Sequence, residues 1–120
     1  MPVATILIVD PDTANRSLLE LLCLRLGHRP IGAGEWADGE TPDLMLLEPA
    51  SSPGLRLALG VRRRFPQLPI VCVSIDGPSE EARELAPVAH LMKPFRRTQL
   101  EDALGQALGA AERIQAERTA

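Results

Sequence analysis

Short, continuous runs of aliphatic residues recur along this chain, and each is followed at once by a polar residue. The clearest runs are Thr5 to Val9 (TILIV) before Asp10, residues 43–47 (DLMLL) before Glu48, and residues 70–75 (IVCVSI) before Asp76. An unbroken apolar run rich in β-branched residues is typical of a strand that is covered on both faces in a parallel sheet. These runs therefore predict the central strands of an α/β sheet.

Helical patterns and weaker strands separate these runs. We expect two further strands, at residues 29–33 and 89–92, and helices over residues 13–26, over residues 55–65, near Ser79, and from a capping box formed by Thr98 and Glu101. Residues 34–42 contain glycines, a proline and acids, so any second helix there has a turn or two at most. Alternating strands and helices predict a doubly wound, five-stranded parallel sheet of the flavodoxin-like type, with helices on both faces.

Length and charge limit the classes of function. At 120 residues the chain fits a single domain, which we place at residues 1–114 with a polar tail at 115–120. A net charge of −3 and an aromatic content of 2% disfavour nucleic-acid binding, and the basic run at residues 62–64 is interpreted as a solvated helix end. Without a membrane-length apolar run or a signal-like start, the expected location is the cytoplasm, with Cys23 and Cys72 as buried apolar residues.

Polar residues at the strand ends form the candidate site. In an open parallel sheet the functional crevice lies outside the carboxyl ends of the strands. Asp10, Glu48, Ser74 and Lys93 stand at or near the ends of four expected strands. Each alone is explained as a helix cap or a loop end, but two acids, a hydroxyl and an amine from four strands predict a polar cluster.

The chain resembles the receiver domain of response regulators, the CheY-like family, over essentially its whole length. The matching segments are ILIVD, PDLMLLEP, PIVCVS and HLMKPF, of which KPF after a short strand is the most specific. The resemblance implies a site where an acidic pair holds Mg²⁺, an aspartate accepts phosphate from a histidine kinase, a hydroxyl binds the phosphoryl group and a lysine neutralises it. By this correspondence Ser74 is the hydroxyl, Lys93 the lysine, His90 the rotamer-switching residue, and Pro94 follows a cis peptide bond.

Two positions depart from the receiver pattern. Glu48 stands where the family has its phosphoacceptor aspartate, and the extra methylene moves the carboxylate by about one bond length toward Lys93. Pro11 stands where the family has a second metal-binding acid, and proline offers no side-chain oxygen. Asp10 and Asp12 are the remaining candidate metal ligands, although Asp12 also suits the N-cap of the first helix. We therefore expect no metal or other cofactor, with Mg²⁺ bound only if the pocket stays competent.

The leading interpretation is a non-enzymatic receiver-like domain in two-component signal transduction, which binds a protein partner and is not phosphorylated in the usual metal-dependent way. The expected partner is a histidine kinase or a downstream protein, or a second copy through the fourth helix, fifth strand and fifth helix; nucleic acid and membrane are not expected. Glu48 either imitates a phosphorylated aspartate through an ion pair with Lys93 or marks a decayed pocket. The alternatives are a phosphoaccepting receiver that uses Asp12, and a small phosphatase-like or flavin-binding protein.

Overall fold

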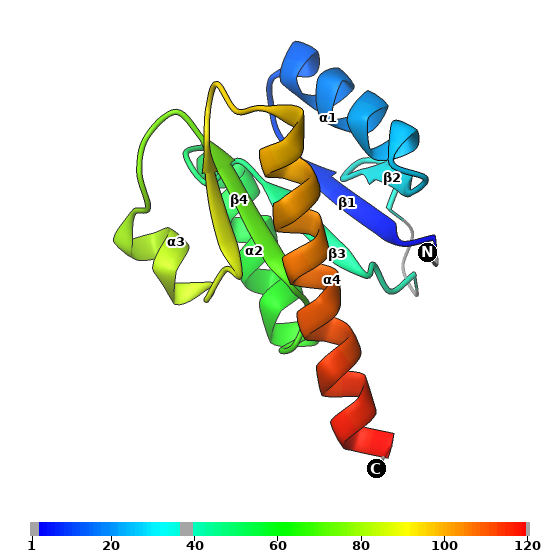
Figure 1. Cartoon of the computed structure of the whole chain (residues 1–120). Coiled ribbons are helices and arrows are strands. Elements are labelled where there is room, and N and C mark those ends of the chain that lie inside the picture. The colour runs from blue at the N-terminus through cyan, green and yellow to red at the C-terminus, as the bar shows by residue number, and fades with distance from the viewer. Residues whose placement is uncertain (1–2, 37–39, 120) are drawn as a thin grey trace.

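A computed structural model describes residues 3–36 and 40–119, with side chains up to residue 109. The chain alternates strands and helices around one central sheet (Figure 1). The strands are β1 (Thr5–Val9), β2 (Arg29–Gly32), β3 (Leu44–Leu47), β4 (Ile70–Ser74) and β5 (Ala89–Met92), and the helices are α1 (Thr13–Arg25), α2 (Ser52–Arg64), α3 (Glu80–Glu84) and α4 (Arg97–Thr119).

The five strands form one parallel sheet in the order β2-β1-β3-β4-β5. β1 pairs with both β2 and β3, and the strand order reverses direction between β1 and β3. The predicted doubly wound α/β architecture is therefore confirmed. Because every strand runs the same way, all carboxyl ends meet at one edge of the sheet, which is the edge that holds the candidate site.

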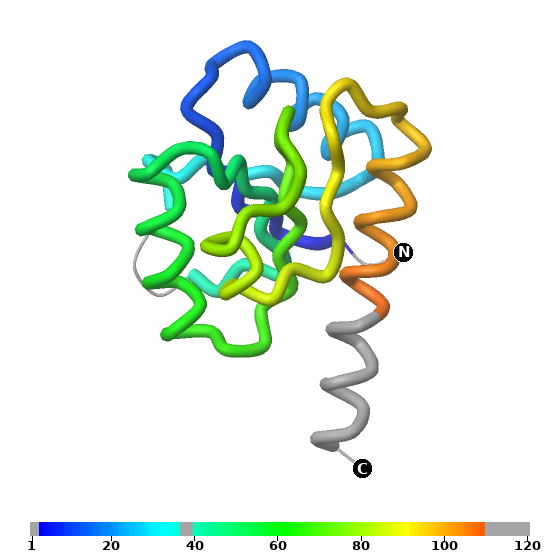
Figure 2. The backbone as a smooth tube through the Cα atoms, turned by 90° about the vertical axis from the view of Figure 1, so that its left-hand side faces the viewer, coloured from blue at the N-terminus to red at the C-terminus, as the bar shows by residue number. Residues whose placement is uncertain are grey.

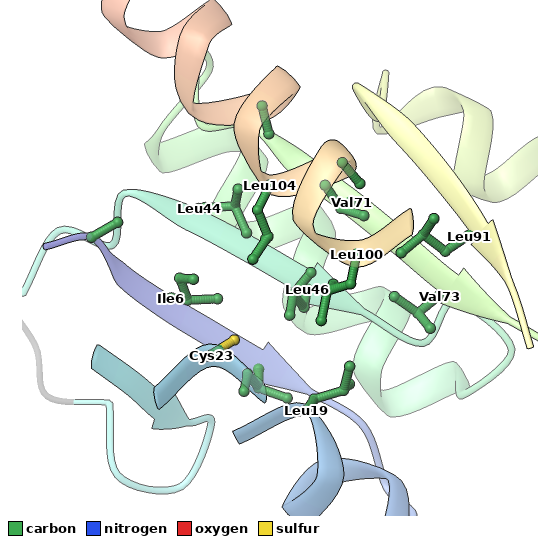
Figure 3. Close-up of a cluster of buried hydrophobic side chains, with 14 residues drawn as sticks. Ile6, Leu19, Cys23, Leu44, Leu46, Val71, Val73, Leu91, Leu100 and Leu104 are labelled. Carbon is green, nitrogen blue, oxygen red and sulfur yellow. The ribbon is translucent and has the colours of Figure 1, made fainter. Parts of the chain in front are cut away.

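Two apolar clusters cover the two faces of the sheet. Alternate residues of a strand point to opposite faces, so Ile6 and Ile8 pack with α1 and α4 (Figure 3), while Leu7 and Val9 pack with α2 and α3. Figure 2 shows α4 and α2 on opposite sides of the strands. The central strands are buried on both faces, as their unbroken apolar runs predict, and this burial holds the strand ends in place.

The stretch between β2 and β3 contains no helix among its described residues, 33–36 and 40–43. Trp36 packs against the sheet where a helix would otherwise lie. Its ring lies 6.4 Å from the ring of Phe65, and its Nε1 donates a hydrogen bond of 3.0 Å to the carbonyl of Glu40. One large indole packed on the α2 side of the core explains how so short a connection still covers the sheet.

Two helix starts differ from the predictions. The helix predicted over residues 55–65 begins earlier, at Ser52, because the Ser51 hydroxyl accepts a hydrogen bond from Gly54 N and Pro53 suits a first helical turn. The capping box of Thr98 and Glu101 is also wrong. Helix α4 begins at Arg97, and Gln99 Oε1 accepts a 2.7 Å bond from Arg96 N, while Glu101 pairs with Arg97 at 3.0 Å.

The basic run at the end of α2 is only partly solvated. Its first member, Arg62, donates hydrogen bonds to the carbonyls of Leu85, Pro66 and Leu68 at 2.7–3.0 Å. A planar guanidinium with five donors can satisfy several loop carbonyls at once. Arg62 therefore fastens the end of α2 to the loops before β4 and β5, and the interpretation of this residue as a solvated helix end is wrong.

Near the C-terminus, the boundary that the sequence predicts at residue 114, between the domain and a polar tail, falls inside α4. This helix continues to Thr119. The side chains of Ala111 and Ile114, which the sequence assigns to the apolar stripe of this helix, lie outside the described side chains. No helix in the part of the chain that the structure describes is long and apolar enough to cross a membrane.

Candidate functional site

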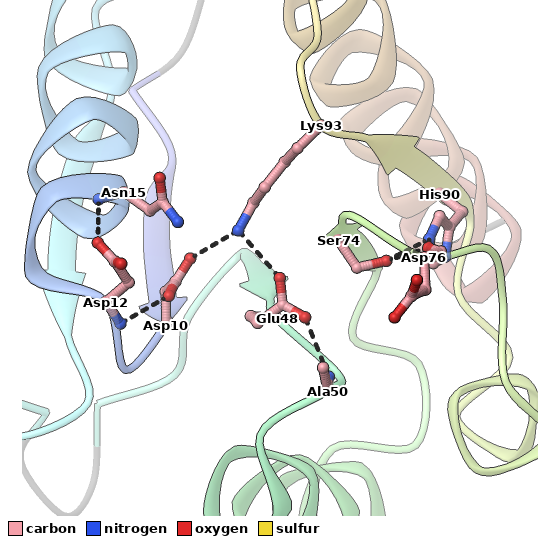
Figure 4. A network of polar contacts seen from close by, with 9 residues as sticks. All are labelled: Asp10, Asp12, Asn15, Glu48, Ala50, Ser74, Asp76, His90 and Lys93. Atoms are coloured by element: carbon pink, nitrogen blue, oxygen red, sulfur yellow. Dashed lines mark hydrogen bonds and ion pairs between the residues drawn. The ribbon is translucent and has the colours of Figure 1, made fainter.

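Three of the expected site residues meet at the carboxyl edge of the sheet. The ammonium of Lys93 lies between two carboxylates, 2.9 Å from Glu48 Oε2 and 3.3 Å from Asp10 Oδ2 (Figure 4). The three side chains are shielded from solvent, with 16% exposure for Lys93, 11% for Glu48 and 2% for Asp10. We refer to Asp10, Glu48 and Lys93 as the ion-pair cluster.

Sheet hydrogen bonds bring these residues together. The amide of Glu48 donates to the carbonyl of Val9 at 2.9 Å, which aligns the ends of β1 and β3. The amide of Lys93 donates to the carbonyl of Ser74 at 2.8 Å, which aligns the ends of β4 and β5. The Lys93–Pro94 peptide bond is cis, the isomer that the receiver resemblance implies. Residues far apart in sequence are thus held within reach of one ammonium group.

The ion-pair cluster does not fit a Mg²⁺ site of the kind the resemblance implies. Both oxygens of Asp10 already accept hydrogen bonds, from Asp12 N and from Lys93, and both oxygens of Glu48 do so as well, from Ala50 N and from Lys93. Mg²⁺ needs oxygen ligands in near-octahedral geometry. An ammonium occupies the space between the two acids, and Pro11 contributes no side-chain oxygen.

Asp12 is the N-cap of α1. Its carboxylate accepts a 3.0 Å hydrogen bond from Asn15 N, and its backbone is extended, as an N-cap requires. This cap turns the carboxylate toward the first turn of the helix and away from Lys93, as Figure 4 shows. Of the two roles considered for Asp12, metal ligand and helix cap, the structure shows the helix cap. Asp12 is not part of the ion-pair cluster. Among the described residues, no group of three or more His, Cys, Asp or Glu side chains is arranged to hold a metal ion.

Electrostatics within the cluster favour the charged form of Lys93. Burial lowers the pKa of the ammonium, but the hydrogen bonds and negative charges of Glu48 and Asp10 outweigh it, so the pKa of Lys93 is raised above its ordinary value. Behind the cluster, burial and then the charge of Glu48 raise the pKa of the Cys72 thiol to about 11. Lys93 is therefore a fixed positive charge at neutral pH, and Cys72 is a neutral thiol.

Ser74 belongs to a second, separate network. Its hydroxyl donates to the carbonyl of Asp76 and lies 2.8 Å from His90 Nε2, on the side away from Glu48 (Figure 4). A hydroxyl has one proton, and here it goes to a carbonyl, so His90 Nε2 must carry the hydrogen that Ser74 accepts. The sequence grouped Ser74 with Lys93, but the structure pairs it with His90.

His90 completes this second network from β5. Its Nε2 also lies 3.2 Å from the carbonyl of Asp76, while its Nδ1 is buried without a hydrogen-bond partner among the described residues. Three groups in the networks are backbone atoms that the sequence analysis missed: the amides of Asp12 and Ala50, and the carbonyl of Asp76. The turn signal at residues 76–78 was the one indication of the latter.

Comparison with known proteins places this arrangement in a fold. No protein-family model matches the sequence, and no curated protein matches it. Among solved structures, NtrX from Brucella abortus is 24% identical with a TM-score of 0.83 over 98% of this chain. A CheY-like response regulator receiver domain protein from Methanospirillum hungatei is 22% identical with a TM-score of 0.82, over 94% of this chain and 99% of its own. The fold is that of a receiver domain.

Further structures agree with this receiver-like fold. The chemotaxis protein CheY4 of Vibrio cholerae is 19% identical with a TM-score of 0.78, and is covered over its whole length. The match to NtrX, by contrast, spans about 30% of that longer protein. The chain therefore has the dimensions of one receiver domain, and Asp10, Glu48 and Lys93 lie at the carboxyl edge of this receiver-like fold.

Proposed function

We propose that this chain is a receiver-like module of two-component signal transduction whose acidic site is closed, so that it acts through protein binding and not through metal-dependent phosphorylation. The observation that carries the proposal is the position of the Lys93 ammonium, 2.9 Å from Glu48 and 3.3 Å from Asp10. A cation that belongs to the protein already neutralises the acids that a divalent metal would otherwise bring together.

Both departures from the receiver pattern support this proposal. Glu48 reaches Lys93 directly, and its other oxygen accepts the amide of Ala50 at 3.0 Å, so the side chain is held at both ends. Pro11 leaves one metal ligand fewer, and Asp12 is engaged as the N-cap of α1. The alternative of a phosphoaccepting receiver with Asp12 as substitute ligand requires that this cap be broken, which costs about 1 kcal/mol.

The contacts of Ser74 indicate whether the closed site imitates the phosphorylated state. A glutamate that fully imitated a phosphorylated aspartate would draw the Ser74 hydroxyl toward itself, since that hydroxyl binds the phosphoryl group in the family that the chain resembles. Here the hydroxyl donates to Asp76 and pairs with His90 instead. We therefore favour a closed pocket in which Ser74 remains on the His90 side, over permanent imitation of the phosphorylated state.

The proposed partner is a histidine kinase or a downstream signalling protein in the cytoplasm. The structural neighbours include receiver domains described as parts of larger signalling proteins, such as a modulated diguanylate cyclase from Desulfovibrio desulfuricans. The sequence analysis predicts association with a second copy through the fourth helix, fifth strand and fifth helix. In the numbering of the structure these elements are α3, β5 and α4, and association through them is one form this binding can take.

The proposal is tested with a small phosphodonor. The wild-type chain, incubated with acetyl phosphate and Mg²⁺ and rapidly quenched, is expected to show no added phosphoryl group by intact-mass spectrometry. The double variant Pro11→Asp/Glu48→Asp restores both missing acids and is the positive control, expected to gain one phosphoryl group. A phosphoryl group on the wild type that is lost in Glu48→Gln would overturn the proposal.

A further inference from the structure

An apolar groove lies between α1 and the loop that joins β5 to α4. Its volume is about 620 Å³, which falls within the range of about 300 to 1,000 Å³ that is usual for small-molecule sites in proteins. Three segments of the chain supply its apolar lining residues, which are Leu18, Leu19, Leu22, Ile75, Pro94 and Phe95. The groove therefore has the size and the walls of a site for one small molecule.

Several of these apolar side chains are in contact with solvent. Ile75 is 72% exposed and Leu18 is 50% exposed. Leu22 and Phe95 are partly buried and pack against the core cluster on the α1 and α4 face of the sheet. Removal of apolar surface from water is favourable in proportion to the area that is covered. The walls of the groove therefore favour a ligand with an apolar body.

The polar lining residues determine which head group such a ligand can carry. They are Asn15, Lys93 and Arg97, and no acid is present among the described residues that line the groove. Lys93 is already held by the two carboxylates of the ion-pair cluster. Arg97 Nε donates to Glu101 Oε1 at 3.0 Å, and the two terminal nitrogens of its guanidinium donate to no described residue. A guanidinium with donors to spare binds a carboxylate in a forked geometry.

We propose that this groove binds a free amphiphile with one aliphatic chain and a carboxylate head, the chemistry of a medium-chain fatty acid. The chain lies along the leucines and Phe95, and the head contacts Arg97. The observation that selects an anionic head is charge: two cations and no described acid line the groove, in a chain whose net charge is −3. This site is separate from the acidic one, and the inference does not depend on whether Glu48 accepts phosphate.

The first test is amide NMR of the full chain with octanoate and with decanoate, without Mg²⁺ or a phosphodonor. Saturable shifts are expected at the amides of Leu18, Leu22, Ile75 and Phe95. Each methylene buried in the groove should tighten binding about fourfold, so decanoate should bind about fifteenfold more tightly than octanoate. The absence of saturable shifts up to about 1 mM decanoate, or equal affinity for the two acids, would overturn the proposal.

Two leucines of α1 provide a matched pair of variants for the chain-binding part. Leu18→Glu places a negative charge inside the groove and is expected to weaken decanoate binding at least tenfold. Leu24→Glu is the control, because Leu24 lies on the same helix, is 59% exposed and does not line the groove. It should bind decanoate like the wild type, and circular dichroism checks that both variants fold. Equal loss of binding in both variants, or in neither, would contradict this site.

Two neighbouring arginines test the head group. Arg97→Gln is expected to weaken decanoate binding about two- to fivefold, as for an exposed ion pair, since the Arg97 side chain is 54% exposed. Arg96→Gln removes the same charge outside the groove lining and should have no such effect. Decyltrimethylammonium, which has the same chain and a cationic head, should bind more weakly than decanoate. A cationic amphiphile that binds as tightly, or equal weakening by both arginine variants, would refute the carboxylate head.

Vesicles distinguish a free amphiphile from a lipid surface. Vesicles of phosphatidylcholine and phosphatidylglycerol in equal amounts are expected not to sediment the chain, whereas decanoate binds it in solution. Sedimentation with vesicles, together with no binding of decanoate, would show that the groove faces a membrane and would overturn the proposal.

Discussion

Replacement of Lys93 by methionine removes the cation of the ion-pair cluster and leaves a side chain of similar length. The ammonium has two anionic partners, at 2.9 Å and 3.3 Å, and each attraction is about 5 to 6 kcal/mol in gross terms at an effective dielectric constant of about 20. Burial of the charged groups opposes most of this gain. In Lys93→Met, however, Asp10 and Glu48 stay shielded and face each other without compensation.

We therefore expect Lys93→Met to lower the free energy of unfolding by about 3 to 5 kcal/mol at neutral pH, the usual cost when one partner of a buried ion pair is removed. The assay is urea unfolding followed by circular dichroism, with a two-state analysis. Such a loss is a large part of the total stability of about 5 to 15 kcal/mol that is typical of a domain.

The matched control is the triple variant Asp10→Asn/Glu48→Gln/Lys93→Met. Asparagine and glutamine keep the oxygens that accept from the amides of Asp12 and Ala50, and they remove both negative charges. The triple variant is expected to recover at least half of the stability lost in Lys93→Met. A single variant that loses less than about 1 kcal/mol, or a triple variant as unstable as the single one, would show that Lys93 does not compensate two buried acids.

Three further predictions follow from the same contacts. Because the pKa of Lys93 is raised in the folded state, its stabilising contribution is present in full below the ordinary value of 10.5 and is lost as pH rises through the folded pKa. The difference in unfolding free energy between wild type and Lys93→Met should shrink in that alkaline range, and a difference that grows there would contradict the sign. Asp12→Ala should cost about 1 kcal/mol through the lost cap on Asn15, and it should leave the response to Mg²⁺ unchanged in a calorimetric titration. Burial raises the pKa values of Cys23 and Cys72 to about 12 and about 11, so a thiol reagent at neutral pH should label them no faster than the chain unfolds; rapid labelling would be inconsistent with the structure.

The sheet was predictable from sequence because its central strands are covered on both faces. Such strands read as unbroken aliphatic runs, and the residue that ends each run falls at one edge of the sheet. Asp10, Glu48 and Lys93 could therefore be grouped from their places in the chain alone. The glycines and the proline between β2 and β3 also predicted a second helix of a turn or two at most. They did not predict that Trp36 packs against the sheet there.

The remaining features depend on neighbours that a one-dimensional pattern does not contain. Ser74 ends β4, as predicted, but its hydroxyl follows the nearest acceptor, the Asp76 carbonyl, and the ring of His90. Arg62 looked like one of three solvated arginines because the carbonyls that it binds lie in loops folded back against α2. The start of α4 was predicted at the wrong residue, because Gln99 accepts a hydrogen bond from the amide of Arg96, two residues before the predicted cap at Thr98.

Amide NMR shows whether the acidic site is closed to metal and phosphoryl groups. Mg²⁺ and then beryllofluoride, a mimic of the acyl phosphate, are titrated into the wild type and into Pro11→Asp/Glu48→Asp while the amides of Asp10, Glu48 and Lys93 are followed. We expect no saturable shift in the wild type and saturable shifts in the double variant. Saturable Mg²⁺ shifts in the wild type that grow with beryllofluoride would contradict this expectation.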